Sequence, residues 1–286
     1  MPAHDPSIPT PHVLMTNIAL GESPRWHDGR LWFSDWGAQE VIAFDLSGKS
    51  EVMARLQSFP FSIDWLPDGH LLIMSGREGL LRLEPDGSLV THTDLTSLAA
   101  PPWNEIVVDG RGNAYVNNLG FAFGTGAEFA PGSIVVVTPD GMARQVADGL
   151  AFPNGMVVTP DNSTLIVAES YGNRLTAFEI AADGSLSNRR VWAELGNDAP
   201  DGICLDAEGA IWYADVPHQH CVRVREGGEV LREITLDRGG FACMLGGTKR
   251  ETLFMMAAKW PDAMSGGTRT GQVLTTDAPA PGAGWP

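Results

Sequence analysis

Residues 63–93 read IDWLPDGHLLIMSGREGLLRLEPDGSLVTHT, and this stretch decides the fold. It contains two Asp-Gly turns, Pro67-Asp68-Gly69 and Pro85-Asp86-Gly87, each between runs of apolar and β-branched residues. Asp-Gly between two such runs is a strong signal for a β-hairpin, because glycine accepts the positive φ that the turn needs. The stretch therefore predicts four short antiparallel strands at residues 63–66, 70–74, 80–84 and 89–93.

The same pattern recurs along the chain. The first turn of each copy contains, in order, Asp28, Asp68, Asp109, Asp161, Asp206 and Thr248, at steps of 40, 41, 52, 45 and 42 residues. Four strands in a period of about 40 residues are typical of propeller blades. We therefore predict an all-β fold, a six-bladed β-propeller with four-stranded antiparallel blades. A β-sandwich is the alternative, but it does not explain the regular pitch.

The sixth copy has no clear fourth strand after residues 271–276. The N-terminal segment at residues 12–18 can supply this strand, which closes the ring and removes exposed sheet edges. We therefore expect a single domain over residues 11–278. Residues 1–10 and 279–286 are rich in Pro, Ala and Gly and are expected to be flexible tails.

The composition restricts the possible partners and the location. The net charge of −16 argues against nucleic acid as a partner. No apolar stretch approaches the roughly 18 residues that span a bilayer, so no membrane association is expected. Cys204, Cys221 and Cys243 have no metal-like spacing, which predicts reduced thiols and a cytoplasmic protein. The sequence does not indicate the oligomeric state.

Four polar residues occupy the same place in four of the copies, about six positions before the first turn: Glu22, Asn104, Asn154 and Asp201. In a closed ring these side chains converge on the central axis. Two carboxylates and two amides offer oxygen ligands for a hard cation, which favours Ca²⁺, with Zn²⁺, Mg²⁺ or Mn²⁺ as alternatives. The competing interpretation is a polar tunnel filled with water.

Several motifs resemble the SMP-30/gluconolactonase/LRE family of six-bladed propellers. They are Leu20-Gly21-Glu22-Ser23-Pro24, Phe152-Pro153-Asn154-Gly155-Met156, Ser187-Asn188-Arg189-Arg190, Pro200-Asp201-Gly202-Ile203 and Asp206-Ala207-Glu208-Gly209, and the resemblance spans about residues 20–271. It implies a divalent ion held by Glu22, Asn154 and Asp201. Related phosphotriesterases and lactonases add an asparagine that matches Asn104. The resemblance also implies lactone hydrolysis, with Asp201 as a proton acceptor.

One segment departs from the family pattern and bears on the substrate. Gluconolactonases commonly carry Asn-Arg-x-Asn-Asp, whereas this chain has Pro101-Pro102-Trp103-Asn104-Glu105, with Pro102 in place of the arginine that holds a sugar acid. This favours an apolar or aromatic lactone or ester over an aldonolactone. The expected substrate-binding residues are Trp103, Glu105, Phe121, Phe123, Ser62 and Trp36. The aromatic residues among them can alternatively serve only to pack a lid.

The segment His218-Gln219-His220 follows the second strand of the fifth copy, on the face that carries Asp201. His218 is therefore a candidate general base beside Asp201. A His-x-His pair also binds transition metals, although this spacing alone is a weak signal, and histidines in surface loops are common. The prediction is a metal-dependent hydrolase (lactonase type) in which the ion acts as a Lewis acid and Asp201 or His218 is the base. A phosphotriesterase-type hydrolase and a non-catalytic calcium- and ligand-binding propeller are the alternatives.

Overall fold

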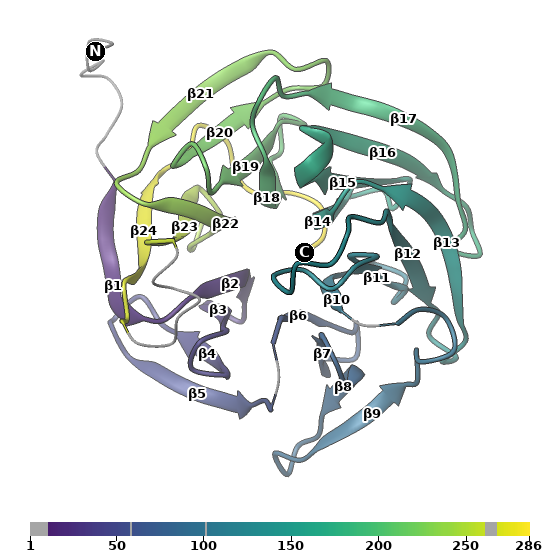
Figure 1. Ribbon diagram of the computed structural model, residues 1–286. Coiled ribbons are helices and arrows are strands. Elements are labelled where there is room, and N and C mark those ends of the chain that lie inside the picture. Colours follow the sequence, from purple (N-terminus) through teal and green to yellow (C-terminus); the bar gives the residue numbers. More distant parts are fainter. Residues whose placement is uncertain (1–10, 58, 101, 261–267) are drawn as a thin grey trace.

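The computed structural model describes residues 11–57, 59–100, 102–260 and 268–286. Its strands form six separate four-stranded antiparallel sheets arranged around a central axis (Figure 1). The predicted six-bladed β-propeller is therefore confirmed. Within the described residues, the only helix is the short 3-10 turn η1 (Ser170–Gly172), and none is long and apolar enough to cross a membrane.

The first three blades follow the predicted order, with the innermost strand first. Blade one contains β2 (Gly21–His27), β3 (Arg30–Asp35), β4 (Glu40–Phe44) and β5 (Ser50–Arg55). Blade two contains β6 (Phe61–Trp65), β7 (Leu71–Ser75), β8 (Gly79–Leu83) and β9 (Leu89–Thr93). Blade three contains β10 (Trp103–Val108), β11 (Ala114–Asn118), β12 (Gly132–Val137) and β13 (Ala143–Leu150).

The next two blades repeat this order, and the sixth is built from both ends of the chain. Blade four contains β14 (Pro153–Val158), β15 (Thr164–Glu169), β16 (Arg174–Ile180) and β17 (Leu186–Glu194). Blade five contains β18 (Pro200–Leu205), β19 (Ile211–Asp215), β20 (His220–Val224) and β21 (Val230–Thr235). Blade six contains β22 (Gly239–Gly246), β23 (Thr252–Ala258), β24 (Gly271–Asp277) and β1 (His12–Ile18). β1 pairs antiparallel with β24, which confirms the predicted closure by the N-terminal segment.

The core is a ring of six apolar layers, each between two neighbouring blades. The layer between blades four and five, for example, joins Ile166 and Leu175 to Ile203 and Tyr213. Equivalent clusters fill the other five junctions. The inner strands of each blade are therefore apolar on both faces, as expected for sheets that are covered on each side, whereas outer strands such as β5 and β9 are partly exposed. This packing fixes the inner strands around the axis.

The starts of the inner strands and the loops between second and third strands lie on the same face. Equivalent backbone hydrogen bonds link them in four blades: Trp36 N donates to Leu20 O, Gly76 N to Pro60 O, Leu119 N to Pro102 O and Ser170 N to Phe152 O. We call this the loop face. The loop at residues 119–131, between β11 and β12, is the long loop of blade three on this face.

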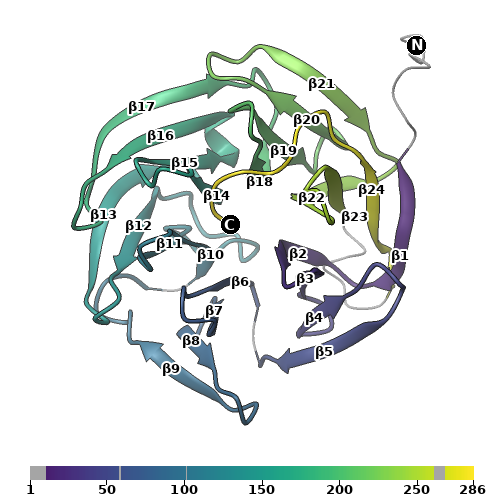
Figure 2. The ribbon, with the colours of Figure 1, turned by 180° about the vertical axis from the view of Figure 1, so that it is seen from behind.

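The C-terminal segment differs from the flexible tail expected at residues 279–286. It runs along the face opposite the loop face to the centre of the ring, where the yellow trace is seen in Figure 2. Trp285 exchanges two backbone hydrogen bonds of 2.8 Å with Val158, and Ala283 N donates to Leu205 O. The ends of inner strands leave unpaired backbone groups there, and the segment pairs with them. The expected tail at residues 1–10 lies outside the described residues.

Candidate functional site

The four axial residues begin the inner strands β2, β10, β14 and β18, and each lies at an irregularity in strand pairing. The register shifts between Glu22 and Arg25, between Trp103 and Ile106, between Pro153 and Met156, and between Pro200 and Ile203. A β-bulge places an extra residue on one strand and redirects its side chains. In blade two, by contrast, β6 pairs with β7 in regular register past Ser62. All four blades that carry the predicted ligands therefore have such a bulge, and blade six has one as well, between Gly240 and Ala242.

Contacts between blades bring these side chains together. Asn104 Nδ2 donates to Asn154 Oδ1 at 3.4 Å and to Pro153 O at 3.3 Å. Asn154 Nδ2 donates to Ser170 Oγ at 3.3 Å, and Asn154 lies close enough to Asp201 to lower the pKa of its carboxyl. Glu22 lies close enough to Asp201 for the two charges to interact. The side chains of the four blades therefore share one region at the axis.

This region is rich in buried negative charge. Burial raises the pKa of Glu22 well above its usual value, and the charges of Asp201 and Glu105 raise it further. Burial, Glu105 and Asp215 likewise raise the pKa of Asp201. Carboxylates that destabilise one another in this way are stabilised by a cation between them. Two carboxylates and two amides that share this buried region offer the hard oxygen ligands that a divalent ion prefers.

Glu105 belongs to the same group and connects it to a buried arginine. Its side chain lies 3.5 Å from Arg25 Nη2, which also donates to Ile106 O at 2.7 Å. Burial raises the pKa of Glu105 to about 7 although Arg25 opposes the rise. Asp64, which accepts a hydrogen bond from Val108 N at 2.7 Å, has a pKa raised by burial to about 6. Glu105 can thus exchange a proton near neutral pH.

The structure does not support Trp103 as a substrate-binding residue. Its side chain is 2% exposed and packs in the apolar layer between blades two and three, against residues such as Leu72 and Leu95. Alternation along a strand explains this position: because Asn104 points to the axis, its neighbour points into the junction between blades. The expectation for Trp103 was therefore wrong.

Two other expected substrate-binding residues belong to blades one and two: Trp36 lies in the loop after β3, and Ser62 lies on the inner strand β6. Ser62 is fully buried, and its Oγ has no hydrogen-bond partner within the described part of the chain. Trp36, on the loop face, donates from Nε1 to Phe61 O at 2.7 Å and is partly exposed.

Phe121 and Phe123 belong to a larger aromatic cluster on the loop face. Phe121 contacts Phe123, Phe129 and Phe152 edge to face, with ring centroids 6.4, 5.6 and 5.8 Å apart. Tyr171 packs on Phe152 at 4.6 Å. Phe123, Phe129 and Tyr171 remain 40%, 51% and 53% exposed, so the cluster presents an apolar surface. We call these five residues the aromatic lid; the sequence analysis identified only two of them.

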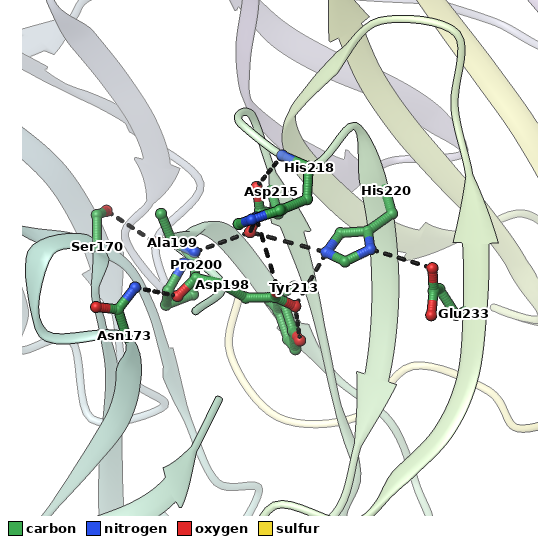
Figure 3. Close-up of polar contacts among 10 residues, drawn as sticks. All are labelled: Ser170, Asn173, Asp198, Ala199, Pro200, Tyr213, Asp215, His218, His220 and Glu233. Carbon is green, nitrogen blue, oxygen red and sulfur yellow. Dashed lines mark hydrogen bonds and ion pairs between the residues drawn. The ribbon is translucent and has the colours of Figure 1, made fainter. Parts of the chain in front are cut away.

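His218 contacts carboxylates other than Asp201. Its Nδ1 lies 3.0 Å from Asp215 Oδ2 and 3.5 Å from Asp198 Oδ1 (Figure 3). His220 Nε2 lies 3.0 Å from Asp198 Oδ2. Burial lowers the pKa of His220, but the nearby carboxylates of Asp215, Asp198 and Glu233 outweigh burial and raise it to about 9. These contacts favour Asp201 over His218 as the base at the axial site.

Sequence reasoning missed Arg25, Asp64, Asp198 and Asp215 as neighbours of the site. Arg25 directly follows the motif that contains Glu22, and Asp215 precedes the predicted histidine loop, so both were close to recognised motifs. Their contacts depend on strand register, which the motifs do not encode.

A cavity of about 480 Å³ opens at the other end of the axis. Its lining includes Arg25, Asp64, Trp65 and Trp285. It lies on the face crossed by the C-terminal segment, away from Asn154 and Asp201. Because the convergent oxygen donors are on the loop face, we place the candidate site there.

Comparison with known proteins finds similar sequences over most of the chain. The family model described as SMP-30/Gluconolactonase/LRE-like region matches residues 20–259. Regucalcin from Xenopus laevis is 26% identical over 263 residues, covering 88% of this chain and 87% of the relative. Diisopropyl-fluorophosphatase from Loligo vulgaris is 25% identical over 210 residues, covering 64% of this chain and 65% of the relative.

Solved structures show the same fold. A luciferin-regenerating enzyme superposes with a TM-score of 0.82 at 18% identity, covering 96% of this chain and 98% of the other. A calcium-binding protein, regucalcin, from Agrobacterium tumefaciens has a TM-score of 0.80 at 23% identity, covering 97% of this chain and 95% of the other.

Proposed function

The chain belongs to the SMP-30/gluconolactonase/LRE-like family, and we propose that it is a divalent-metal-dependent hydrolase that opens a lactone, or a related ester, to a hydroxy acid. One observation carries the proposal: Glu22, Asn104, Asn154 and Asp201 meet at the axis in a region of buried, mutually destabilising carboxylates. This donor set suits Ca²⁺ best, because all the ligand atoms are hard oxygens, with Zn²⁺, Mg²⁺ or Mn²⁺ as alternatives.

The residues of the chain have distinct roles in this proposal. A bound divalent ion would supply Lewis acidity to the substrate carbonyl. Asp201 accepts the proton of the attacking water, the role that the family resemblance implies for it, and it lies beside Asn154 and Glu22 at the axis. Ser170 holds the amide of Asn154, and Pro153 O holds that of Asn104, so both amides keep a fixed orientation. Glu105, which lies 3.5 Å from Arg25 Nη2, adds a further buried negative charge beside Glu22 and Asp201.

The surroundings favour an apolar or aromatic substrate. Pro102 stands where gluconolactonases carry an arginine for the sugar acid, and the aromatic lid presents exposed Phe123, Phe129 and Tyr171 on the loop face. Rings prefer to contact one another edge to face or offset, so an aromatic lactone gains contacts there that an aldonolactone does not. We therefore expect higher kcat/KM for an aromatic lactone than for an aldonolactone.

The central experiment measures lactone hydrolysis with chelated protein, with Ca²⁺ added back, and with Asp201→Asn. We expect turnover only with the metal, and a loss of at least about 100-fold in the variant, as is typical for removal of a general base. Asp140→Asn, in an exposed turn of blade three, is the matched control and should keep full activity. Retention of wild-type activity by Asp201→Asn would show that this assignment is wrong.

Two other functions are favoured by specific relatives. The likeness to diisopropyl-fluorophosphatase favours a phosphotriesterase-type hydrolase at the same site, which a substrate panel containing an organophosphate triester would reveal. The calcium-binding regucalcin favours a binding propeller without catalysis. That function predicts stabilisation by Ca²⁺ with no turnover of any lactone, ester or phosphotriester.

The proposed partner is a small molecule, and the proposed location is the cytoplasm. Cys204, Cys221 and Cys243 are all free and buried, as expected for thiols in a reducing compartment. A thiol titration of protein freshly released from cells under non-reducing, denaturing conditions should find three free thiols per chain.

A further inference from the structure

Two carboxylates and two imidazoles face one another in blade five, beside the axial site. Asp198 lies three residues before Asp201, in the loop that leads into β18, and Asp215 ends β19. His218 lies in the loop between β19 and β20, and His220 begins β20. Figure 3 shows the four side chains directed toward one another. One ligand atom from each lies within 4.8 Å of the others.

Four nitrogen–oxygen separations in this cluster, which involve both oxygens of Asp198, are near those around a small tetrahedral ion. His218 Nδ1 is 3.0 Å from Asp215 Oδ2 and 3.5 Å from Asp198 Oδ1. His220 Nε2 is 3.0 Å from Asp198 Oδ2 and 3.7 Å from Asp215 Oδ2. Zn²⁺ binds nitrogen and oxygen at roughly 2.0–2.1 Å, so ligands at the corners of a tetrahedron are about 3.3 Å apart. The four distances lie on both sides of this value.

His220 is oriented as a metal ligand would be. Its Nε2 is buried and makes no well-aligned hydrogen bond with a described residue, although Asp198 Oδ2 is near. Its other ring nitrogen, Nδ1, lies 3.3 Å from Glu233 Oε1. A carboxylate on the far nitrogen is the usual partner that orients a metal-binding histidine.

The carboxylates are also held in place by groups around the cluster. The hydroxyl of Tyr213 donates to Asp198 Oδ2 at 2.6 Å. Asp215 accepts hydrogen bonds from Ala199 N and His218 N, both at 2.8 Å. Asp215 is fully buried, whereas the side chain of His218 is 42% exposed. The cluster therefore combines fixed ligands with a path for an ion to enter from solvent.

Blade four has a different set of groups at the equivalent position. Glu169 ends β15 as Asp215 ends β19, and it accepts a hydrogen bond from Ala151 N at 2.7 Å just before the inner strand. Two guanidinium groups, those of Arg174 and Arg189, neutralise Glu169 at 3.0 and 3.1 Å. In blade five, two imidazoles and a second carboxylate occupy this environment. Imidazoles bind metals and guanidinium groups do not.

We propose that Asp198, Asp215, His218 and His220 bind a transition-metal ion of the Zn²⁺ class, at a site separate from the axial oxygen cage. Mixed nitrogen and oxygen ligands favour such an ion over Ca²⁺ or Mg²⁺. Its four ligands are distinct from Glu22, Asn104, Asn154 and Asp201, although the charge of Asp215 acts on Asp201.

Co²⁺ provides a direct test because its visible absorption is intense in a tetrahedral site. The full chain is stripped of metal, saturated with Ca²⁺ and titrated with Co²⁺ at mildly alkaline pH, where protons compete least for the histidines. We expect one Co²⁺ per chain with tetrahedral absorption, which Zn²⁺ then displaces. A spectrum of octahedral Co²⁺ only, or no stoichiometric binding, would overturn the proposal.

Variants distinguish this site from the axial one. His218→Gln and His220→Gln should each weaken Co²⁺ binding by about 100-fold or more, and Glu233→Gln by about 10-fold, as for loss of a group that orients a ligand. His92→Gln, on β9 of blade two, and Glu22→Gln, at the axis, should leave the Co²⁺ spectrum unchanged. Circular dichroism checks that each variant is folded. If Glu22→Gln removes the Co²⁺ absorption, or if His220→Gln keeps it, the blade-five site does not exist.

Discussion

Replacing Glu22 with Gln should have opposite effects on stability in the absence and in the presence of Ca²⁺. Without the ion, the Glu22 carboxylate is disfavoured by burial and by the charges of Asp201 and Glu105. An amide of the same shape removes that repulsion, so the melting temperature of the metal-free variant should equal or exceed that of the wild type. When Ca²⁺ is present, the variant lacks a charged ligand, so its melting temperature should rise little.

The size of the effect follows from the linkage between binding and folding. An ion at 100 times its Kd stabilises the folded state by about 2.7 kcal/mol. For a chain of this size, 1 kcal/mol corresponds to about 2–4 °C in Tm. The wild-type Tm should therefore rise by about 5–10 °C when Ca²⁺ is added at that excess. For Glu22→Gln the rise should be a small fraction of this.

Thermal unfolding in EDTA and in Ca²⁺ measures both effects in one experiment. Glu128→Gln makes the same chemical change at an exposed loop position and should respond to Ca²⁺ as the wild type does. The reasoning is refuted if the wild-type Tm does not depend on Ca²⁺, or if Glu22→Gln retains the full increase.

Three further predictions concern the surroundings of the site. Burial raises the pKa of Asp64 to about 6 and of Glu105 to about 7. Because these carboxyls bind protons more tightly in the folded state, the metal-free protein should lose stability as pH rises from about 4 to 7. Glu105→Gln should make the measured Tm less dependent on pH. A Cβ at Gly155 would lie 2.6 Å from Ile203 N and 2.7 Å from Asp201 O. Gly155→Ala should therefore lower the free energy of unfolding by about 1–3 kcal/mol in chemical denaturation, and it should weaken Ca²⁺ binding in a calorimetric titration. An unchanged affinity would contradict the packing of β14 on β18. Deleting residues 279–286 removes the backbone hydrogen bonds to Val158 and Leu205 and should therefore lower Tm by several degrees. An unchanged Tm would mean that the segment contributes nothing to stability.

The fold was predictable because its determinants are local. Asp-Gly turns such as Asp68-Gly69 specify a hairpin within a few residues, and their regular spacing gives the number of blades. The closure of blade six by residues 12–18 followed from counting strands. The segment 279–286 was predicted less well, because its Pro, Ala and Gly content resembles that of a flexible tail. Its backbone pairs with strand ends that are distant in the sequence.

The site was predictable in position but not in detail. The repeat placed Glu22, Asn104, Asn154 and Asp201 at the axis, because equivalent positions in a ring share a direction. The direction of Trp103 depends on its neighbour Asn104, and only the register of β10 settles it. The contact of Asp198 with His220 joins residues from separate strands of blade five, so no short motif contains it.

The joining of β1 to β24 sets an order of events during synthesis. A ribosome adds about 5–20 residues per second, so the roughly 250 residues between these strands take about 13–50 s to make. During this interval β1 has no β24 to pair with, and blade six cannot be completed. An unpaired strand is prone to associate with other chains. The nascent protein is therefore expected to depend most on chaperones before its last strand emerges. Association between unpaired strands of different chains would begin on polysomes, where many nascent chains are close together.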